Sequence, residues 1–362
     1  MRRHKPDYLI IAILGSLVIF GLVVLASASS NLGQAKFGDS FYYLKHQALY
    51  GLTLGIAGFI VAFRIYYRHY QKFAVIFLIV SIAALILVFT PLGLKVGGAE
   101  RWVKIGPLTV QPAEILKITF ILYLAAWLSG PKERYENIKK GFLPFLLVII
   151  VIAALLIKQP STASVFIIIA TAIILYFTSG AKLRYIIGVG VLGIAALATV
   201  VYFTPYRLER IVNYLQPGAN PLAGGYHINQ AQIAIGSGGL FGVGYGQSTT
   251  KISYLPEPIG DSIFAVIAEE MGFVGSILLI AAFMLLIYKT FTLAKKTRDR
   301  FGKLILVGFG SLIGIQVFVN IAAISGLIPL TGVPLPFISY GGTALAVFMT
   351  MGGVIANVSR YS

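Results

Sequence analysis

Long apolar stretches alternate with short polar links along almost the whole chain. A helix that crosses a bilayer needs about 20 mainly apolar residues, and ten stretches of this kind follow one another. We expect membrane-spanning helices over residues 8–29, 44–63, 72–91, 112–129, 141–157, 161–179, 184–204, 264–290, 303–327 and 334–356. The pattern predicts an all-α polytopic membrane protein in which residues 1–362 form a single integral membrane domain.

The connection between the seventh and eighth predicted helices, residues 205–263, is much longer than the others. It carries charged residues, Asn, Gln and many Gly, but also amphipathic pieces such as Tyr226 to Ile235. Long connections in compact proteins are usually functional or disordered, and this one is too apolar for disorder. We therefore expect a large extracytoplasmic loop that carries part of a functional site.

The composition agrees with a membrane protein and excludes several kinds of chemistry. Residues are 58% hydrophobic and 11% charged, whereas about a quarter of the residues of a soluble domain are charged. Cysteine is absent and the four histidines are scattered, which excludes thiol chemistry and zinc sites. The net charge of +17 comes mostly from short links between apolar runs, as in membrane topology signals. We expect no nucleic-acid partner.

The charged residues also predict an orientation. Because the number of predicted helices is even, both termini lie on the same side of the membrane. If that side is the cytoplasm, Lys and Arg fall on inner links about twice as often as on outer ones, in agreement with the positive-inside rule. Most acidic residues then lie outside or at membrane depth. We therefore expect the polar chemistry on the outer face.

The densest polar cluster runs from Lys251 to Glu270. A Pro-rich turn there places Glu257 and Asp261 at the mouth of the eighth predicted helix. Since Asp261 precedes an apolar helical run, one interpretation is a helix N-cap, in which the side chain accepts a backbone N–H. The other is a partly desolvated carboxylate with a raised pKa, which acts as a general base on a hydroxyl. Both interpretations can hold together.

Further charged residues lie inside predicted helices, where a lipid-facing charge is costly, so these residues must face protein, water or a cation. For Glu269 and Glu270 we favour structural ion pairs with Lys117 or another outer basic residue. Glu114 lies three residues before Lys117 on one helical face, which suits an internal ion pair. The alternative is that nearby basic side chains neutralise the phosphates of a substrate: Arg101, Lys104 and Lys117.

Two glycine-rich segments stand out, residues 236–246 and 332–343. The first either forms backbone N–H nests for phosphate or packs closely against other backbone. Upstream of it, Arg207 and Arg210 either bind anionic headgroups or lie on a solvated face. The second segment contains Ser339 and opens the last predicted helix with Pro and Gly, where a regular helix cannot start cleanly. Irregular backbone at membrane depth lines a cavity or is buried in protein.

These clusters, in this order within ten predicted helices, resemble the SEDS family (shape, elongation, division and sporulation). The resemblance covers nearly the whole chain, with matching text at residues 98–102, 111–117, 234–242, 254–258 and 334–342. Residues 242–248 and 251–257 resemble the cell-division members, such as FtsW, more than the elongation members, such as RodA. Family members commonly read Gln-Pro-Asp-Leu-Gly where this chain has Gln159-Pro-Ser161-Thr-Ala, so no acidic role is carried over to Ser161.

The resemblance implies a peptidoglycan glycosyltransferase that polymerises lipid II, a disaccharide-pentapeptide on undecaprenyl pyrophosphate, on the outer face of the bacterial cytoplasmic membrane. Asp261 matches the family's essential aspartate and is the expected general base. The leaving pyrophosphate needs preset positive charge, for which we expect Arg101, Lys104, Lys117, Arg207 and Arg210, with Glu114, Glu257 and Ser339 as further substrate-binding candidates. No cofactor is assigned, and Mg²⁺ or Mn²⁺ held by carboxylates is left open as a helper.

The resemblance also implies a class B penicillin-binding protein and other division proteins as partners, with both termini in the cytoplasm and the site at the division septum. Three alternatives stay open. The chain is an elongation-type polymerase, a lipid II flippase whose transport path is lined by buried charges, or a non-catalytic scaffold for a partner's helix. For the flippase, the expected lining residues are Glu114, Lys117, Glu269 and Glu270.

Overall fold

The computed structural model describes residues 4–96, 99–106, 108–215 and 225–362. Gly98 of the first matching segment and part of the long loop, residues 216–224, lie outside this part of the chain. Each predicted apolar stretch coincides with a helix: α1 (Tyr8–Phe37), α3 (Thr53–Arg64), α4 (Arg68–Leu87), α5 (Pro112–Leu128), α7 (Leu143–Lys158), α8 (Thr162–Thr178), α9 (Leu183–Tyr202), α13 (Ile263–Lys296), α14 (Arg300–Ile324) and α15 (Gly342–Ser359).

Shorter elements extend these helices. α2 (Tyr42–His46) continues through a π-helical stretch, Gln47–Leu52, into α3, and a second π-helical stretch, Ile138–Phe142, leads from α6 (Glu133–Glu136) into α7. Within the described residues, seven helical segments are long and apolar enough to cross a membrane, and two shorter apolar helices cover Thr162–Thr178 and Leu183–Ala196. The chain is a polytopic helical membrane protein, as predicted, while the count of ten crossings stays a prediction.

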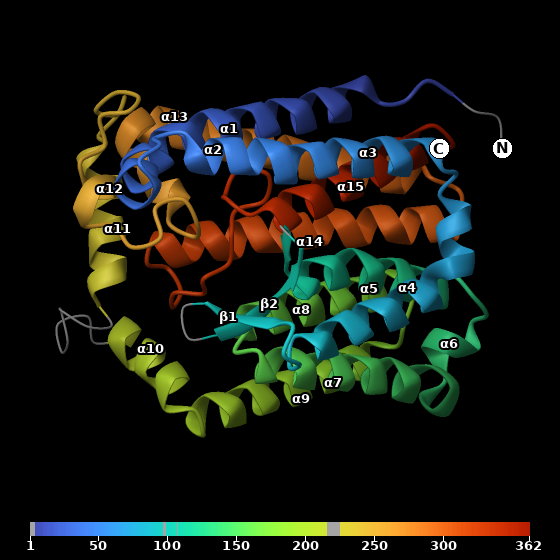
Figure 1. The fold of residues 1–362 in the computed structure, drawn as a ribbon. Helices are drawn as coiled ribbons and strands as arrows, with labels where there is room; N and C mark the ends of the chain where they lie inside the picture. The colour runs from blue at the N-terminus through green and yellow to red at the C-terminus, as the bar shows by residue number, and fades with distance from the viewer. Residues whose placement is uncertain (1–3, 97–98, 107, 216–224) are drawn as a thin grey trace.

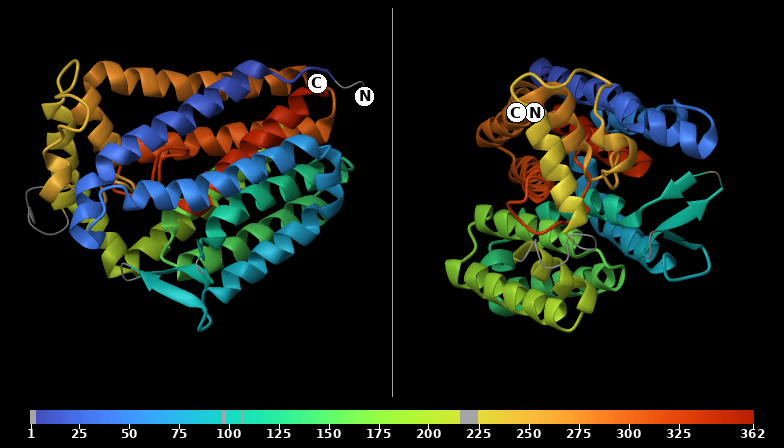
Figure 2. Two further views of the ribbon diagram at one scale, coloured as in Figure 1. Left: turned by 45° about the horizontal axis from the view of Figure 1, so that its top comes forward. Right: turned by 90° about the vertical axis from the view of Figure 1, so that its left-hand side faces the viewer.

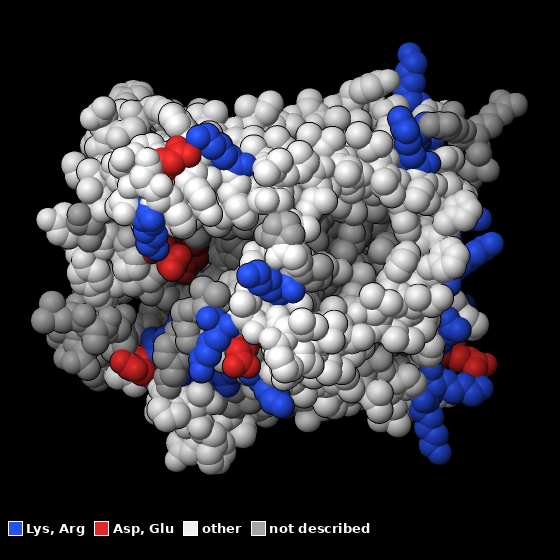
Figure 3. All heavy atoms as spheres, viewed as in Figure 1, with Lys and Arg blue, Asp and Glu red and all other residues white. Residues whose placement is uncertain are grey.

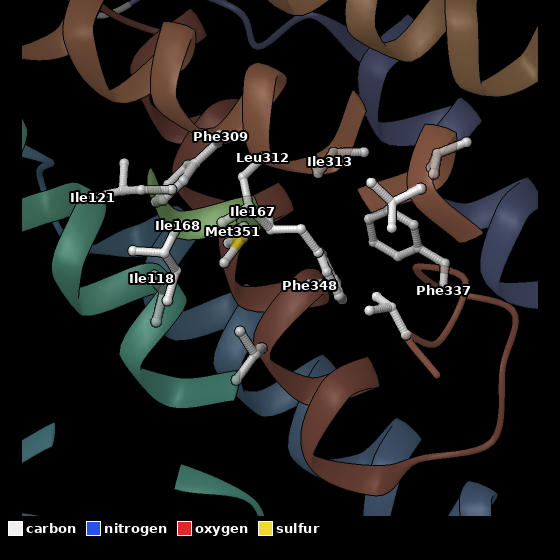
Figure 4. Packing of buried hydrophobic residues seen from close by; sticks show 14 of the residues in the cluster. Ile118, Ile121, Ile167, Ile168, Phe309, Leu312, Ile313, Phe337, Phe348 and Met351 are labelled. Atoms are coloured by element: carbon white, nitrogen blue, oxygen red, sulfur yellow. The ribbon is translucent and has the colours of Figure 1, made fainter. Parts of the chain in front are cut away.

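The helices run along one common direction and form two halves (Figure 1). Helices α4–α9 make up one half, and α1–α3 with α13–α15 make up the other, as the end-on view in Figure 2 shows. α14 joins the halves because it contacts α13 and α15 on one side and α5 and α8 on the other. Apolar side chains fill the space around this helix (Figure 4): Ile118, Ile121, Ile167, Ile168, Phe309, Leu312, Ile313, Phe337, Phe348 and Met351.

The two termini lie at the same end of the helices (Figure 1), where the backbone N–H of His4 donates to the carbonyl of Arg360 at 2.7 Å. The long loop lies at the opposite end. Its described part contains α10 (Pro205–Leu215), α11 (Tyr226–Ser237) and α12 (Thr250–Ser253), and the amphipathic piece at 226–235 lies in α11. Charged side chains gather toward these two ends and around the nearby sheet, and uncharged surface covers the helices between them (Figure 3).

The structure adds two features that the apolar pattern did not predict. Between α4 and α5 the chain forms an antiparallel sheet in the order β1 (Gly93–Val96), β2 (Ala99–Ile105), β3 (Leu108–Val110). β1 and β3 are too short to show an alternation of polar and apolar residues, and β2 places three charged residues, Glu100, Arg101 and Lys104, on both faces of the strand. In addition, α15 starts at Gly342 rather than at 334, because Pro334 and Pro336 remove backbone donors that a helix needs.

Candidate active site

A cavity of about 370 Å³ is lined by residues of both halves, among them Arg207 and Arg210 of the long loop. Its walls come from β2, α5, the start of α8, the end of α9, α10, α14 and the irregular segment 328–334. Residues more than 200 positions apart in the sequence thus meet around one space. Several predicted site residues line it together: Arg101, Glu114, Lys117, Arg207 and Arg210.

The three arginines are fixed at the edge of the cavity by backbone carbonyl groups. Arg101 donates from Nε to the carbonyl of Gln159 at 3.2 Å and from Nη2 to that of Pro160 at 2.5 Å. Arg207 and Arg210 lie one turn apart on α10 and donate to the carbonyls of Ile157 and Leu330, each at 3.0 Å. These bonds hold guanidinium groups, which recognise phosphate through paired N–H donors, beside the cavity.

Glu114 and Lys117 form the internal ion pair that their spacing predicts. Lys117 Nζ lies 2.6 Å from Glu114 Oε1 and donates to Gln316 Oε1 at 2.8 Å. Both side chains are almost fully buried, yet both line the cavity. Glu114 Oε2 has no hydrogen-bond partner among the described residues. The pair is therefore structural in its contacts and is also placed to meet a ligand.

Asp261 lies in the turn just before α13, outside the apolar helix itself. α13 begins after Ser262, and no side chain caps its N-terminus, so the interpretation of Asp261 as a helix N-cap is wrong. Instead, Oδ1 of Asp261 is buried without a hydrogen-bond partner in the described part of the chain. Burial raises the pKa of Asp261 to about 6, against the lowering effect of backbone hydrogen bonds and of the Arg210 charge. A base of this pKa is ionised at neutral pH.

Gly332 connects Asp261 to the cavity. This glycine lines the cavity and has a backbone φ of +67°, which side-chain-bearing residues rarely adopt. A Cβ added to it would lie 3.7 Å from Asp261 Oδ2. Because Gly332 has no side chain, only its backbone lies between the Asp261 carboxylate and the cavity.

Three predicted binding residues lie away from the cavity lining. Lys104 is exposed on β2, and the Glu257 side chain is exposed in a turn where the residue has a φ of +48°. Ser339 is buried; its Oγ accepts from Leu335 N at 2.8 Å and donates to the carbonyl of Gly260 at 2.7 Å. Ser339 thus ties the Pro-rich segment to the turn that carries Asp261.

The glycine-rich segment 236–246 packs against a break in α13. At Gly272 the helix has φ 65° and ψ −164°, and the segment supplies hydrogen bonds across the break. Val243 N donates to the carbonyl of Glu269 at 2.9 Å, and Phe273 N donates to that of Gly239 at 2.9 Å. A Cβ on Gly242 would collide with the backbone of Glu270. The glycines therefore serve close backbone packing, the second of the two interpretations.

Glu269 and Glu270 are held in a buried network close to this break. Glu270 pairs with Lys251 at 2.5 Å rather than with Lys117, and it also accepts from Ser27 Oγ at 2.6 Å. Glu269 accepts from Ser248 Oγ at 2.5 Å and from Thr249 N at 3.0 Å. The favoured interpretation of an ion pair with another outer basic residue fits Glu270, whereas hydroxyl and backbone donors surround Glu269.

Two buried amides on α14 belong to the site and are missing from the sequence-based set. Gln316 donates from Nε2 to the carbonyl of Pro334 at 2.9 Å, and it also accepts from Lys117. Asn320, one turn further, donates from Nδ2 to the carbonyl of Asp261 at 2.9 Å and to that of Val333 at 2.7 Å. Two amides four residues apart in an apolar helix are the signal that could have identified them.

The described residues contain no group of three or more His, Asp and Glu side chains placed to hold a metal ion. Glu114 and Asp261 are acidic groups near the cavity, each with an oxygen that has no partner among the described residues. Mg²⁺ binds proteins through one or two carboxylates together with substrate phosphates and water, so a helper cation stays a prediction. The chemistry below is derived from the side chains of the chain alone.

The fold and the site together define a polytopic membrane protein with a buried acid beside a cationic cavity at one end of its helices. The family model described as "Cell cycle protein", FtsW/RodA/SpoVE, matches residues 7–362. The chain belongs to this family.

Individual relatives agree over nearly the full length. The chain is 35% identical to stage V sporulation protein E of Bacillus subtilis (strain 168), covering 100% of this chain and 99% of the relative. It is 38% identical to a probable peptidoglycan glycosyltransferase FtsW of Geobacter metallireducens, covering 98% and 95%.

Solved structures show the same fold. One match is a chain of a peptidoglycan synthase complex, whose structure concerns the coordination of polymerization and crosslinking. It has a TM-score of 0.81 at 28% identity, with 98% of each chain covered. The rod shape determining protein RodA of Thermus thermophilus has a TM-score of 0.73 at 27% identity, covering 99% of this chain and 98% of that one.

Proposed function

We propose that this chain polymerises lipid II at the cavity between its two halves, with Asp261 as the general base. The reaction class is that of its relatives: the chain is a peptidoglycan glycosyltransferase of cell-wall synthesis. One observation carries the assignment of the site. The buried carboxylate of Asp261 has one oxygen, Oδ1, without a partner among the described residues, and its other oxygen, Oδ2, lies next to Gly332 of the cavity wall. The same cavity is lined by four basic side chains: Arg101, Lys117, Arg207 and Arg210.

The two sides of this arrangement match the two needs of the reaction. A sugar 4-hydroxyl attacks the anomeric carbon of a second lipid II molecule, and Asp261 takes the hydroxyl proton as the new C–O bond forms. The bond between the anomeric carbon and the lipid pyrophosphate breaks, and negative charge develops on the leaving oxygen. Preset positive charge in a low-dielectric site stabilises this charge, which is the role we assign to the basic wall.

The apolar part of the cavity suits the lipid end of the substrate. Phe166 of α8, Val201 of α9, Ile211 of α10 and Ile328 line it beside the arginines. A pyrophosphate joined to a polyprenol needs a cationic contact next to an apolar one. We assign this corner of the cavity, between α8 and α10, to the first isoprene units.

The orientation and the setting complete the proposal. The positive-inside pattern supports cytoplasmic termini, which would put the cavity near the outer surface of the bacterial cytoplasmic membrane. The FtsW relatives support septal wall synthesis during cell division. The relative that belongs to a peptidoglycan synthase complex supports a class B penicillin-binding protein as partner, together with other division proteins.

The test is polymerisation of labelled lipid II by the purified chain with its cognate penicillin-binding protein, whose transpeptidase is blocked. Wild type should produce glycan ladders on a gel, and Asp261→Asn should lose them. Asp39→Asn is the matched control, because this carboxylate is at the same end of the helices but forms an exposed pair with Lys45 at 2.7 Å. Ladders from Asp261→Asn would refute the base. Their absence from every variant, with the complex intact, would favour lipid II transport instead.

A further inference from the structure

Two buried side-chain oxygens of the cavity lining have no hydrogen-bond partner within the described residues: Glu114 Oε2 and Thr331 Oγ1. Asp261 Oδ1 and Asn320 Oδ1 also lack a partner there, and their residues meet the lining at Gly332 and Val333. More than about nine in ten buried polar groups in proteins have a partner, so each of these oxygens is costly when it is left alone. A molecule that binds in the cavity and supplies hydrogen bonds would satisfy the two that line it.

Thr331 differs from the basic side chains in what it can bind. It lines the cavity and directly precedes Gly332, the residue next to Asp261 Oδ2. A hydroxyl both donates and accepts one hydrogen bond or more, as do the hydroxyl and acetamido groups of a sugar. The Thr331 hydroxyl therefore matches a sugar, whereas Arg101 and Arg207, which bind the carbonyls of residues 157–160, match a pyrophosphate.

Asn320 holds the Thr331 segment and the base together. Its Nδ2 donates both to the carbonyl of Asp261 at 2.9 Å and to that of Val333 at 2.7 Å. One amide group thus fixes the backbone on either side of the contact between Asp261 and Gly332. The side chain is 1% exposed, so its position is set by the surrounding protein.

We propose that Thr331 binds the sugar that carries the attacking hydroxyl, and that Asn320 is a positioning residue that fixes this sugar-binding segment against Asp261. The inference rests on the proposed function. It assigns the acceptor to the part of the cavity at Thr331, and the leaving pyrophosphate to the part at Arg101 and Arg207, which bind the carbonyls of residues 157–160. The proton passes from the acceptor hydroxyl to Asp261, and neither Thr331 nor Asn320 changes its protonation state.

The experiment compares Thr331→Val, which removes the hydroxyl and keeps the shape, with Thr331→Ser, which keeps the hydroxyl. Initial rates of glycan formation are measured over a range of lipid II concentrations. Thr331→Val should lower kcat/KM about tenfold, mainly through a higher KM, because one hydrogen bond to the substrate is lost. Thr331→Ser should stay close to wild type.

Ser311→Ala is the matched control. Ser311 is on α14 like Asn320, is buried, and has an Oγ without a partner among the described residues, but it is not among the residues that line the cavity. Its removal should leave KM unchanged. Asn320→Leu should lower kcat about a hundredfold, because a base displaced by about 1 Å loses that much, while Thr331→Val leaves kcat nearly unchanged.

The outcomes distinguish a failure of the proposed function from a failure of the roles of Thr331 and Asn320. If wild type forms no glycan, the proposed function fails. If wild type is active and Thr331→Val has the KM of Ser311→Ala, the sugar assignment is overturned while the polymerase stands. An Asn320→Leu protein that melts like wild type and keeps its kcat would overturn the positioning role. Should Asn320→Leu not fold, the contrast between Thr331→Val and Thr331→Ser still decides the sugar assignment.

Discussion

Two buried ion pairs lie near the loop end of the molecule, and they differ in how completely their polar atoms are used. Lys251 and Glu270 pair at 2.5 Å, and Lys251 also donates to Ser27 and to the carbonyl of Gly246. Lys117 and Glu114 pair at 2.6 Å, but Glu114 Oε2 lacks a partner within the described residues, and both side chains line the cavity. We call the Lys251–Glu270 pair closed, because it bonds only to other protein groups and stabilises the fold. We call the Lys117–Glu114 pair open, because Glu114 Oε2 is left to accept a hydrogen bond from a ligand.

The largest expected effect is on the closed pair. Lys251→Met would leave Glu270 as an uncompensated buried charge, which costs about 3 to 5 kcal/mol of stability. Thermal unfolding of the purified protein in detergent should show a large drop in melting temperature. The double variant Lys251→Met/Glu270→Gln removes both charges and should recover much of the loss. A single variant that melts like wild type would contradict the structural role of this pair.

The open pair should affect activity more than stability. Lys117→Met removes one preset cation from the cavity, and the loss of such electrostatic help costs about 100-fold to 1000-fold in kcat. We expect a smaller drop in melting temperature than for Lys251→Met, because the cavity admits water next to Glu114. Adding Glu114→Gln neutralises the leftover charge without replacing the cation, so activity should stay low. Recovery of activity in that double variant would show that Lys117, like Lys251, has a structural role only.

The pH dependence tests whether Asp261 belongs to the open region as its base. With a pKa of about 6, the carboxylate becomes protonated as the pH falls, so kcat/KM should drop about tenfold for each pH unit below 6. Above pH 7 the rate should reach a plateau. Initial polymerisation rates between pH 5 and pH 8 check this. A rate that is constant down to pH 5 would exclude Asp261 as the base.

The smallest expected effect is a gain in stability on removing that charge. The folded-state pKa of Asp261 is raised above the unfolded value of 3.8, so the folded protein binds the proton more tightly. Stability is then greatest at low pH and falls as the pH rises through about 6. Asp261→Asn should therefore raise the melting temperature at pH 8 and do so much less at pH 4. An equal shift at both values would indicate a cause other than charge.

The helices were predictable because length and hydropathy determine them without any long-range information. The sheet at 93–110 was not, since its strands pair with each other but carry no clear period. The N-cap interpretation of Asp261 failed for a similar reason. Local rules predict a cap where an acid precedes a helix, but α13 begins after Ser262, and the carbonyl of Asp261 is bound by Asn320, which is distant in sequence.

The basic wall was found because charges in an apolar chain are conspicuous, and five predicted residues do meet at one cavity. Gln316 and Asn320 were missed because they carry no charge, and the candidate residues were identified by their charge or by glycine-rich and proline-rich segments. Their importance arises from the carbonyls they hold, at Pro334, Val333 and Asp261, and the pairing of an amide with a particular carbonyl cannot be read from one sequence. Lys104 is the opposite case. It is a charged residue close in sequence to Arg101, but its side chain is exposed and is not among the residues that line the cavity.

The break in α13 has a consequence for building chimaeras between members of the family. Backbone donors and acceptors of residues 239–244 complete the hydrogen bonding of residues 269–274, and Gly242 and Gly272 leave no room for a side chain between the two. The connection and the helix that it precedes therefore form one packed unit. A loop exchanged between relatives should function when the segment around Gly272 is transplanted along with it, so the interchangeable module is the loop plus the first turns of α13.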